Sequence, residues 1–157
     1  MVRNNMNNID IIYNMMDWQN DEALQKSGRA LAENLVDLSP LIMPIGKKSI
    51  WENCARVIAE KSDHVLRPYL FKLLIWLQDM NWPGAFIIAE RLKKVNVSIL
   101  SAPLSEAIDI AQSKADDIWL DYLAIFIECR EIEQYLSAQR YNLLVQHYKN
   151  FWDESSG

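Results

Sequence analysis

Residues 68–94 read PYLFKLLIWLQDMNWPGAFIIAERLKK, and this stretch decides the fold. Apolar residues recur at helical spacing on both sides of a short polar turn, which predicts one helix over 69–78 and another over 85–92. Asp79 and Asn81 can bond backbone N–H groups in that turn and close a tight corner. The stretch is therefore expected to form a hairpin of two helices.

The same period continues outward from the hairpin and predicts helices over most of the chain. These are 9–16, 21–35, a short helix around 54–58 that ends near 61, one starting at Ser101 and Pro103, one from Asp116 to Cys129, and 132–151, with a break near Ser137 as an alternative. Ser49 and Glu52 have the spacing of a capping box. Ser62 and Asp63, ahead of His64, are typical of a helix N-cap rather than of acid–base chemistry. Residues 38–46 contain two prolines and a glycine and are expected to connect two helices.

The composition supports long helices. Among 157 residues there are 4 glycines, 5 prolines and no threonine, and 50% of the chain is apolar. Few turn residues and no Thr argue against a sandwich or barrel. We expect an all-α fold of about eight helices in a HEAT-like array of antiparallel helix pairs, forming one domain over 1–152 with a frayed tail over 153–157.

Two sets of identities suggest an internal duplication. At an offset of 62, Asp17, Ala23 and Arg29 match Asp79, Ala85 and Arg91. At an offset of 68, Ile50, Trp51 and Glu60 match Ile118, Trp119 and Glu128. Each copy would then span several helices.

Several classes of function are disfavoured. The net charge of −5 argues against DNA or RNA as the main ligand. The N-terminus lacks the apolar region of a secretory signal, and no apolar run is long enough to span a membrane. Cys54 and Cys129 stand alone and suit small buried hydrophobes in a reducing cytoplasm, with a disulfide as the alternative. With only His64 and His147 beside them, no metal site, cofactor site or catalytic motif is expected.

Three strings, WENCAR at 51–56, PYL at 68–70 and WLQDMNWPGA at 76–85, resemble a family of small bacterial helical domains of unknown function. The similarity covers about residues 9–129. It implies a short HEAT-type array and a relationship to immunity proteins of bacterial toxin systems, including contact-dependent growth inhibition. Residue chemistry alone favours a structural role for Trp76 and Trp82, as a turn and a staple; a binding hot spot is the alternative.

The negative charge is concentrated in one segment. Residues 1–78 carry equal numbers of acidic and basic residues, whereas residues 106–133 carry eight acidic residues against Lys114 and Arg130. Within a helix starting at Asp116, Asp117, Asp121 and Glu128 would lie within about 40° of one another. They would form an acidic stripe without basic neighbours for i,i+4 pairing.

The predicted partner-binding residues follow from this stripe. They are Asp116, Asp117, Asp121, Glu128, Glu131 and, in the first copy, Glu60. A solvated helix face is the alternative interpretation. A partner-binding stripe would steer a basic protein, such as a toxin nuclease that itself binds phosphates.

These observations lead to a hypothesis of a non-enzymatic, cytoplasmic immunity protein that blocks a cognate basic toxin domain. One alternative is a HEAT-like adaptor that holds a peptide or helix in an apolar groove. A carboxylate-based enzyme is the third class, and it would need a deep pocket with a strongly perturbed Asp or Glu.

Overall fold

A computed structural model describes the backbone of residues 2–153 and the side chains of residues 8–153. These residues form an all-helical chain without strands. Its α-helices are α1 (Val2–Met15), α2 (Glu22–Ala32), α3 (Trp51–Ala59), α4 (Asp63–Leu66), α5 (Leu70–Ile75), α6 (Ala85–Leu92), α7 (Val97–Ser113), α8 (Asp117–Leu123), α9 (Ile132–Tyr135) and α10 (Ala138–Phe151). Five 3₁₀ turns join them: η1 (Ser39–Leu41), η2 (Lys48–Ile50), η3 (Arg67–Tyr69), η4 (Trp76–Gln78) and η5 (Ala124–Glu128). Since α4 and α9 are single turns, eight longer helices remain within the described part, as the sequence predicts. Residues 154–157 of the expected tail lie outside it.

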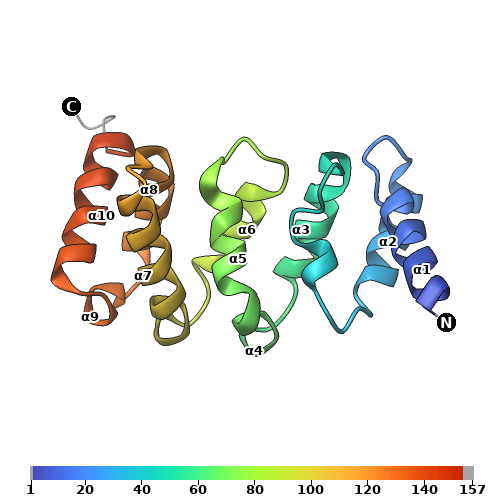
Figure 1. Ribbon diagram of the computed structural model, residues 1–157, viewed down its shortest axis with the longest axis horizontal. Helices are drawn as coiled ribbons and strands as arrows, with labels where there is room; N and C mark the ends of the chain where they lie inside the picture. The colour runs from blue at the N-terminus through green and yellow to red at the C-terminus, as the bar shows by residue number, and fades with distance from the viewer. Residues whose placement is uncertain (1, 154–157) are drawn as a thin grey trace.

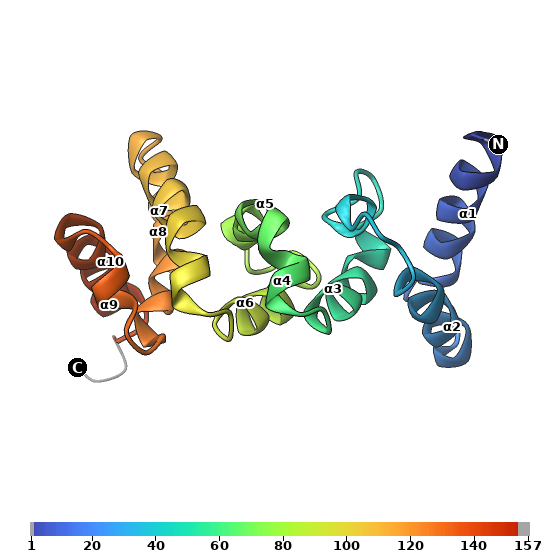
Figure 2. The same ribbon diagram turned by 90° about the horizontal axis from the view of Figure 1, so that it is seen from below.

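The helices stack side by side into an elongated array, with the two chain ends at opposite ends of its long axis (Figure 1). Seen from below, α1, the connector that precedes α3, α5 and α7 form one row, and α2, α3 and α6 form a second row beneath it (Figure 2). The packing follows this order, since α1 contacts α2, α3 contacts α6, α7 contacts α8, and α10 closes the array against α8 and η5. The core is continuous along the array.

Four helices begin with a side-chain N-cap, of which the sequence predicts the one at Ser62. The side chains of Asp21, Ser62, Asp116 and Ser137 each accept a hydrogen bond from the backbone N–H three residues further on. Each such bond satisfies one of the N–H groups that a helix start leaves without a partner. The cap at Ser137 separates α9 from α10, so the last helical segment is interrupted there.

The predicted capping box at Ser49 and Glu52 is wrong. Ser49 lies within η2, and α3 begins at Trp51 without any side-chain cap. The Ser49 hydroxyl instead donates to Asp17 over 3.0 Å. The Ser49 side chain is therefore directed towards a long-range acceptor, Asp17, and does not cap the start of α3.

The predicted start of α7 at Ser101 is also wrong, because the helix begins at Val97. Asn96 caps it through a 2.9 Å bond to the N–H of Ser98, and Pro103 lies inside it. The apolar stripe of α7 runs through the proline, with Leu100 and Leu104 both fully buried. Burial of that stripe outweighs the backbone hydrogen bond that Pro103 cannot make.

Three tryptophans hold the central hairpin to α3. Trp51 contacts Trp76 and Trp82 edge-on, with ring centroids 5.7 and 5.8 Å apart. Trp76 is fully buried, and its indole N–H donates to the carbonyl of Pro83 on the far side of the turn. Asp79 accepts the N–H of Asn81 and closes the corner as the sequence predicts. Trp76 therefore has a structural role, because a fully buried ring is not available to a partner.

Gly84 allows α6 to approach α3 closely. It occupies the left-handed region, with φ of +81°, immediately before α6. A Cβ at this position would lie 2.7 Å from the Cβ of Ala55 and 2.8 Å from the carbonyl oxygen of Trp51. The position thus requires glycine for two independent reasons, its backbone angle and the missing side chain.

The predicted duplication describes one repeated turn and not a repeated set of helices. Asp17 and Asp79 form the same turn, since each accepts the N–H of the residue two positions on over 2.9 Å. However, Trp51 and Trp119 both face the central hairpin, one by ring contact with Trp76 and the other by a hydrogen bond to the carbonyl of Leu74. Helices related by translation along an array would point these rings in the same direction. The offset of 68 therefore does not describe a stacked repeat.

A polar joint attaches α1 and α2 to the rest. Asn53 on α3 is 4% exposed and is the one buried polar side chain among the described residues. Its amide donates to the Met16 carbonyl and to Gln25, at 2.6 and 2.9 Å, and its oxygen accepts from Arg29 at 2.6 Å. All of its side-chain hydrogen bonds therefore reach residues of the α1–α2 pair or the turn at its centre.

Substitution of the two left-handed glycines tests the close approach at α6. Gly84→Ala should lower the free energy of unfolding by about 2–5 kcal/mol, because backbone strain and overpacking add. Gly46→Ala is the matched control, since φ there is +72° but no atom lies within 4 Å of the added Cβ. It should cost only the strain, about 1–2 kcal/mol. Urea denaturation measures both, and equal losses would contradict the packing argument.

Candidate partner-binding surface

Asp116 and Asp117 begin α8 and have different surroundings. Asp116 is half-buried, and its carboxylate accepts the N–H of Trp119 over 3.1 Å as the helix cap. Asp117, in the first turn of the helix, is exposed and makes no ion pair with a described residue. The cap positions the helix, whereas Asp117 presents its charge to solvent.

Asp121 faces α10 instead of solvent. Its carboxylate oxygen lies 2.7 Å from Nδ1 of His147, and both side chains are about one-fifth exposed or less, at 21% and 16%. Its backbone carbonyl accepts the indole N–H of Trp152, also at 2.7 Å. Asp121 is therefore an attachment point for α10.

Glu128 is paired on two sides. One carboxylate oxygen lies 3.4 Å from the Lys93 ammonium, and the other accepts the Tyr148 hydroxyl over 3.0 Å. The carboxylates of Glu90 and Glu128 raise the pKa of Lys93. The hydrogen bond to Glu128 raises the pKa of Tyr148. Glu128 thus joins α10 to the end of α6.

These contacts correct the expectation of a continuous, unpaired acidic stripe. The α-helix ends at Leu123 and continues as the 3₁₀ turn η5 up to Glu128. A 3₁₀ turn advances by 120° per residue instead of 100°, which rotates Glu128 by about 80° relative to a continued α-helix. The basic and hydroxyl partners come from α6 and α10, which the i,i+4 rule does not consider.

The other two predicted residues, Glu131 and Glu60, lie outside α8. Glu131 is exposed just before α9 in the left-handed region, with φ of +71°. Glu60 is exposed at the C-terminal end of α3, and α6 lies between α3 and α8 in the array (Figure 1). The structure therefore does not bring Glu60 together with the carboxylates of α8.

A third polar tie holds the start of α10. Arg140 binds Asp109 of α7 through two hydrogen bonds of 2.9 and 2.7 Å. This bidentate contact lowers the pKa of Asp109. Asp109, Asp121 and Glu128 thus each supply one carboxylate to α10, which buries only Leu144 fully. Helix α10 is therefore held by these charged and polar contacts in addition to apolar packing.

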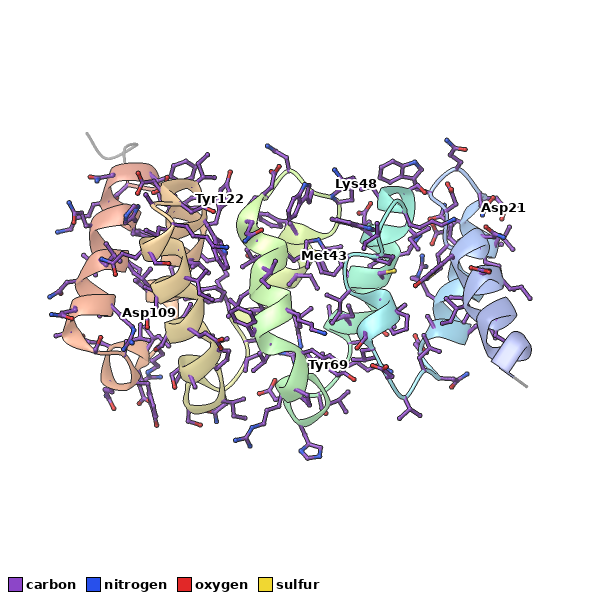
Figure 3. All side chains as sticks on the ribbon, viewed as in Figure 1. Asp21, Met43, Lys48, Tyr69, Asp109 and Tyr122 are labelled. Atoms are coloured by element: carbon purple, nitrogen blue, oxygen red, sulfur yellow. The ribbon has the colours of Figure 1, made fainter. Side chains whose placement is uncertain are left out.

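Sequence reasoning missed the aromatic end of α10. The rings of Tyr122, Phe151 and Trp152 contact one another, with centroids 5.7, 6.4 and 4.8 Å apart. Tyr122 lies at the end of the molecule where α10 finishes (Figure 3). The paired aromatics at 151–152 and the i,i+4 spacing of Ile118 and Tyr122 were available signals, but nothing local connects the two helices.

The chemistry of the titratable groups is limited. A His–Asp pair is half of an acid–base apparatus, but the hydrogen bonds among the described side chains bring no nucleophilic hydroxyl or thiol to His147. No three His, Cys, Asp or Glu side chains of the described residues form a group suited to a metal ion. Both cysteines are unpaired and buried, and burial raises the pKa of Cys54 to about 12.

The sequence profile of a family described as a domain of unknown function, DUF5071, matches residues 45–153. This chain belongs to that family. The match begins before α3 and includes all the helices up to α10, so α1 and α2 lie outside this DUF5071 domain. Neither the curated proteins nor the solved structures contain a match. None of the described helices is long and apolar enough to cross a membrane.

Alkylation tests the inertness of Cys54. At about pH 8 only about one in ten thousand of its thiols would be ionised in the folded protein, so iodoacetamide should label it only after unfolding in urea. The raised pKa also means that folded Cys54 keeps its proton while the unfolded thiol loses it. Its contribution to the free energy of unfolding should therefore fall as the pH rises from about 9 towards 12, and a Cys54→Ala variant should lose that pH dependence. Rapid labelling of Cys54 in the native protein, distinguished from labelling of Cys129 by peptide mass spectrometry, would contradict this assignment.

Proposed function

We propose that this DUF5071 protein is a non-enzymatic immunity protein, which binds and neutralises a basic bacterial toxin domain in the cytoplasm. The observation that carries the proposal is a set of exposed carboxylates in the segment 106–133 that make no ion pair with a described residue. They are Glu106, Asp117, Glu131 and Glu133. The exposed cations of the same segment are Lys114 and Arg130.

The exposed, unpaired carboxylates favour association with a positively charged protein. Unpaired charges of one sign add little to helix stability and repel one another. The same charges accelerate encounter with a basic partner and fix its orientation. A toxin nuclease is basic because its own substrate is a polyanion, so an acidic surface can occupy its phosphate-binding cleft. The relationship to immunity proteins that the motifs around Trp51 and Trp76 imply is in line with the same proposal.

A HEAT-like adaptor is the second candidate. One feature favours it, an apolar groove of about 310 Å³ between α1 and α2. The exposed side chains of Ile11 and Leu31 contribute to it, together with Ile12 and Leu35. Binding of an apolar helix in such a groove would be insensitive to salt, whereas binding through carboxylates weakens as salt increases.

Charge reversal tests the acidic surface. The double variant Asp117→Lys/Glu131→Lys should slow association with the co-expressed product of the neighbouring toxin gene by about tenfold and flatten its salt dependence. Asp10→Lys/Glu33→Lys is the matched control, because it makes the same change in net charge at exposed residues of α1 and the end of α2. Surface plasmon resonance at several salt concentrations measures both variants. Equal effects of the two variants would overturn the acidic-surface mechanism.

A further inference from the structure

A compact apolar patch lies where α8 and α10 meet at the C-terminal end of the array. The rings of Tyr122, Phe151 and Trp152 contact one another, and Ile118 lies one turn before Tyr122 on α8; these four residues are called the aromatic patch below. Ile118 is 63% exposed, Phe151 44% and Trp152 38%. Isolated exposed apolar residues are ordinary, but contiguous ones with a tryptophan resemble the centre of a protein interface.

The rings of the aromatic patch are held in fixed positions. Tyr122 and Phe151 contact edge to face at 5.7 Å, and Phe151 and Trp152 at 4.8 Å. The indole N–H of Trp152 donates to the Asp121 carbonyl over 2.7 Å, which fixes the orientation of that ring. Because the rings are ordered before binding, a partner would pay little conformational entropy to use them.

Carboxylates border the aromatic patch. Exposed Asp117 precedes Ile118 and makes no ion pair with a described residue, and Asp121, whose carboxylate is bound to His147, lies one turn further along α8. The nearest basic residue on α10, Lys149, is about 160° around the helix from Phe151. Lys114 precedes the cap of α8 and is separated from it by Ala115, which has a positive φ of 53°. The border is thus mainly acidic, and aromatic faces themselves attract cations.

We infer that the aromatic patch is the anchoring part of the toxin-binding surface, and that it receives a basic amphipathic helix which places an apolar side chain on the rings and Arg or Lys beside Asp117. This inference rests on the proposed function and refines it. The carboxylates then set the rate of association, and the rings set the lifetime of the complex. Phe86 provides a comparison, because it is 66% exposed on α6 but lies outside the aromatic patch.

Truncation of the patch tests the inference with the toxin. Ile118→Ala/Phe151→Ala should weaken binding of the co-expressed neighbouring-gene product by at least about tenfold, mainly through faster dissociation. Phe86→Ala removes a ring that is more exposed than Phe151 and should change the affinity by less than about twofold. If the toxin binds the double variant as tightly as the native chain, the patch assignment is wrong while the proposed function stands.

A peptide tests the patch separately from the toxin. The probe is a helical peptide with Leu at i, i+3, i+4 and i+7 spacing and Arg on its flanks, and the control peptide has Glu in place of Arg. The native chain should bind only the Arg peptide, with a change in tryptophan fluorescence that the Trp152→Phe variant reduces. Loss of binding in Ile118→Ala/Phe151→Ala, but not in Phe86→Ala, supports the inference. Equal binding of the Glu peptide, or unchanged binding by the double variant, would overturn it.

Discussion

The contact between α3 and α6 is the constraint on which the rest of the array depends. At Gly84 the backbone approaches Ala55 and the carbonyl of Trp51 so closely that no side chain fits between them. This approach lets Trp51 reach both Trp76 and Trp82, which fixes the central hairpin against α3. The remaining helices pack outward from that centre in both directions, α2 on one side and α7 with α8 on the other.

The fold was largely predictable because its signals are local. Helix periodicity and side-chain caps such as Asp21 and Ser137 act over three or four residues, a distance that a sequence shows directly. The errors arose where a distant residue competed. The Ser49 hydroxyl donates to Asp17 and does not cap α3. Burial of Leu100 and Leu104 allows α7 to continue past Pro103.

The candidate site was less predictable, for a related reason. The concentration of carboxylates on and around α8 is a property of the sequence, and the exposure of Asp117 agrees with it. Whether a carboxylate of this segment is paired depends on residues of other helices that are distant in the sequence. His147 and Tyr148 from α10 occupy Asp121 and Glu128, and a helical wheel of α8 alone contains neither group. The contact of Tyr122 with Phe151 and Trp152 likewise joins two helices, so neither helix alone predicts it.

The polar joint at Asn53 connects the DUF5071 domain to the helix pair outside it. The family's sequence similarity begins at residue 45, yet α1 and α2 are fastened to α3 by an amide buried as completely as the core around it. An apolar seam tolerates sliding, whereas an amide that must meet one carbonyl, one glutamine and one arginine accepts a single alignment. The α1–α2 pair, which lies outside the matched residues, is thereby held in one position against the domain that contains α3.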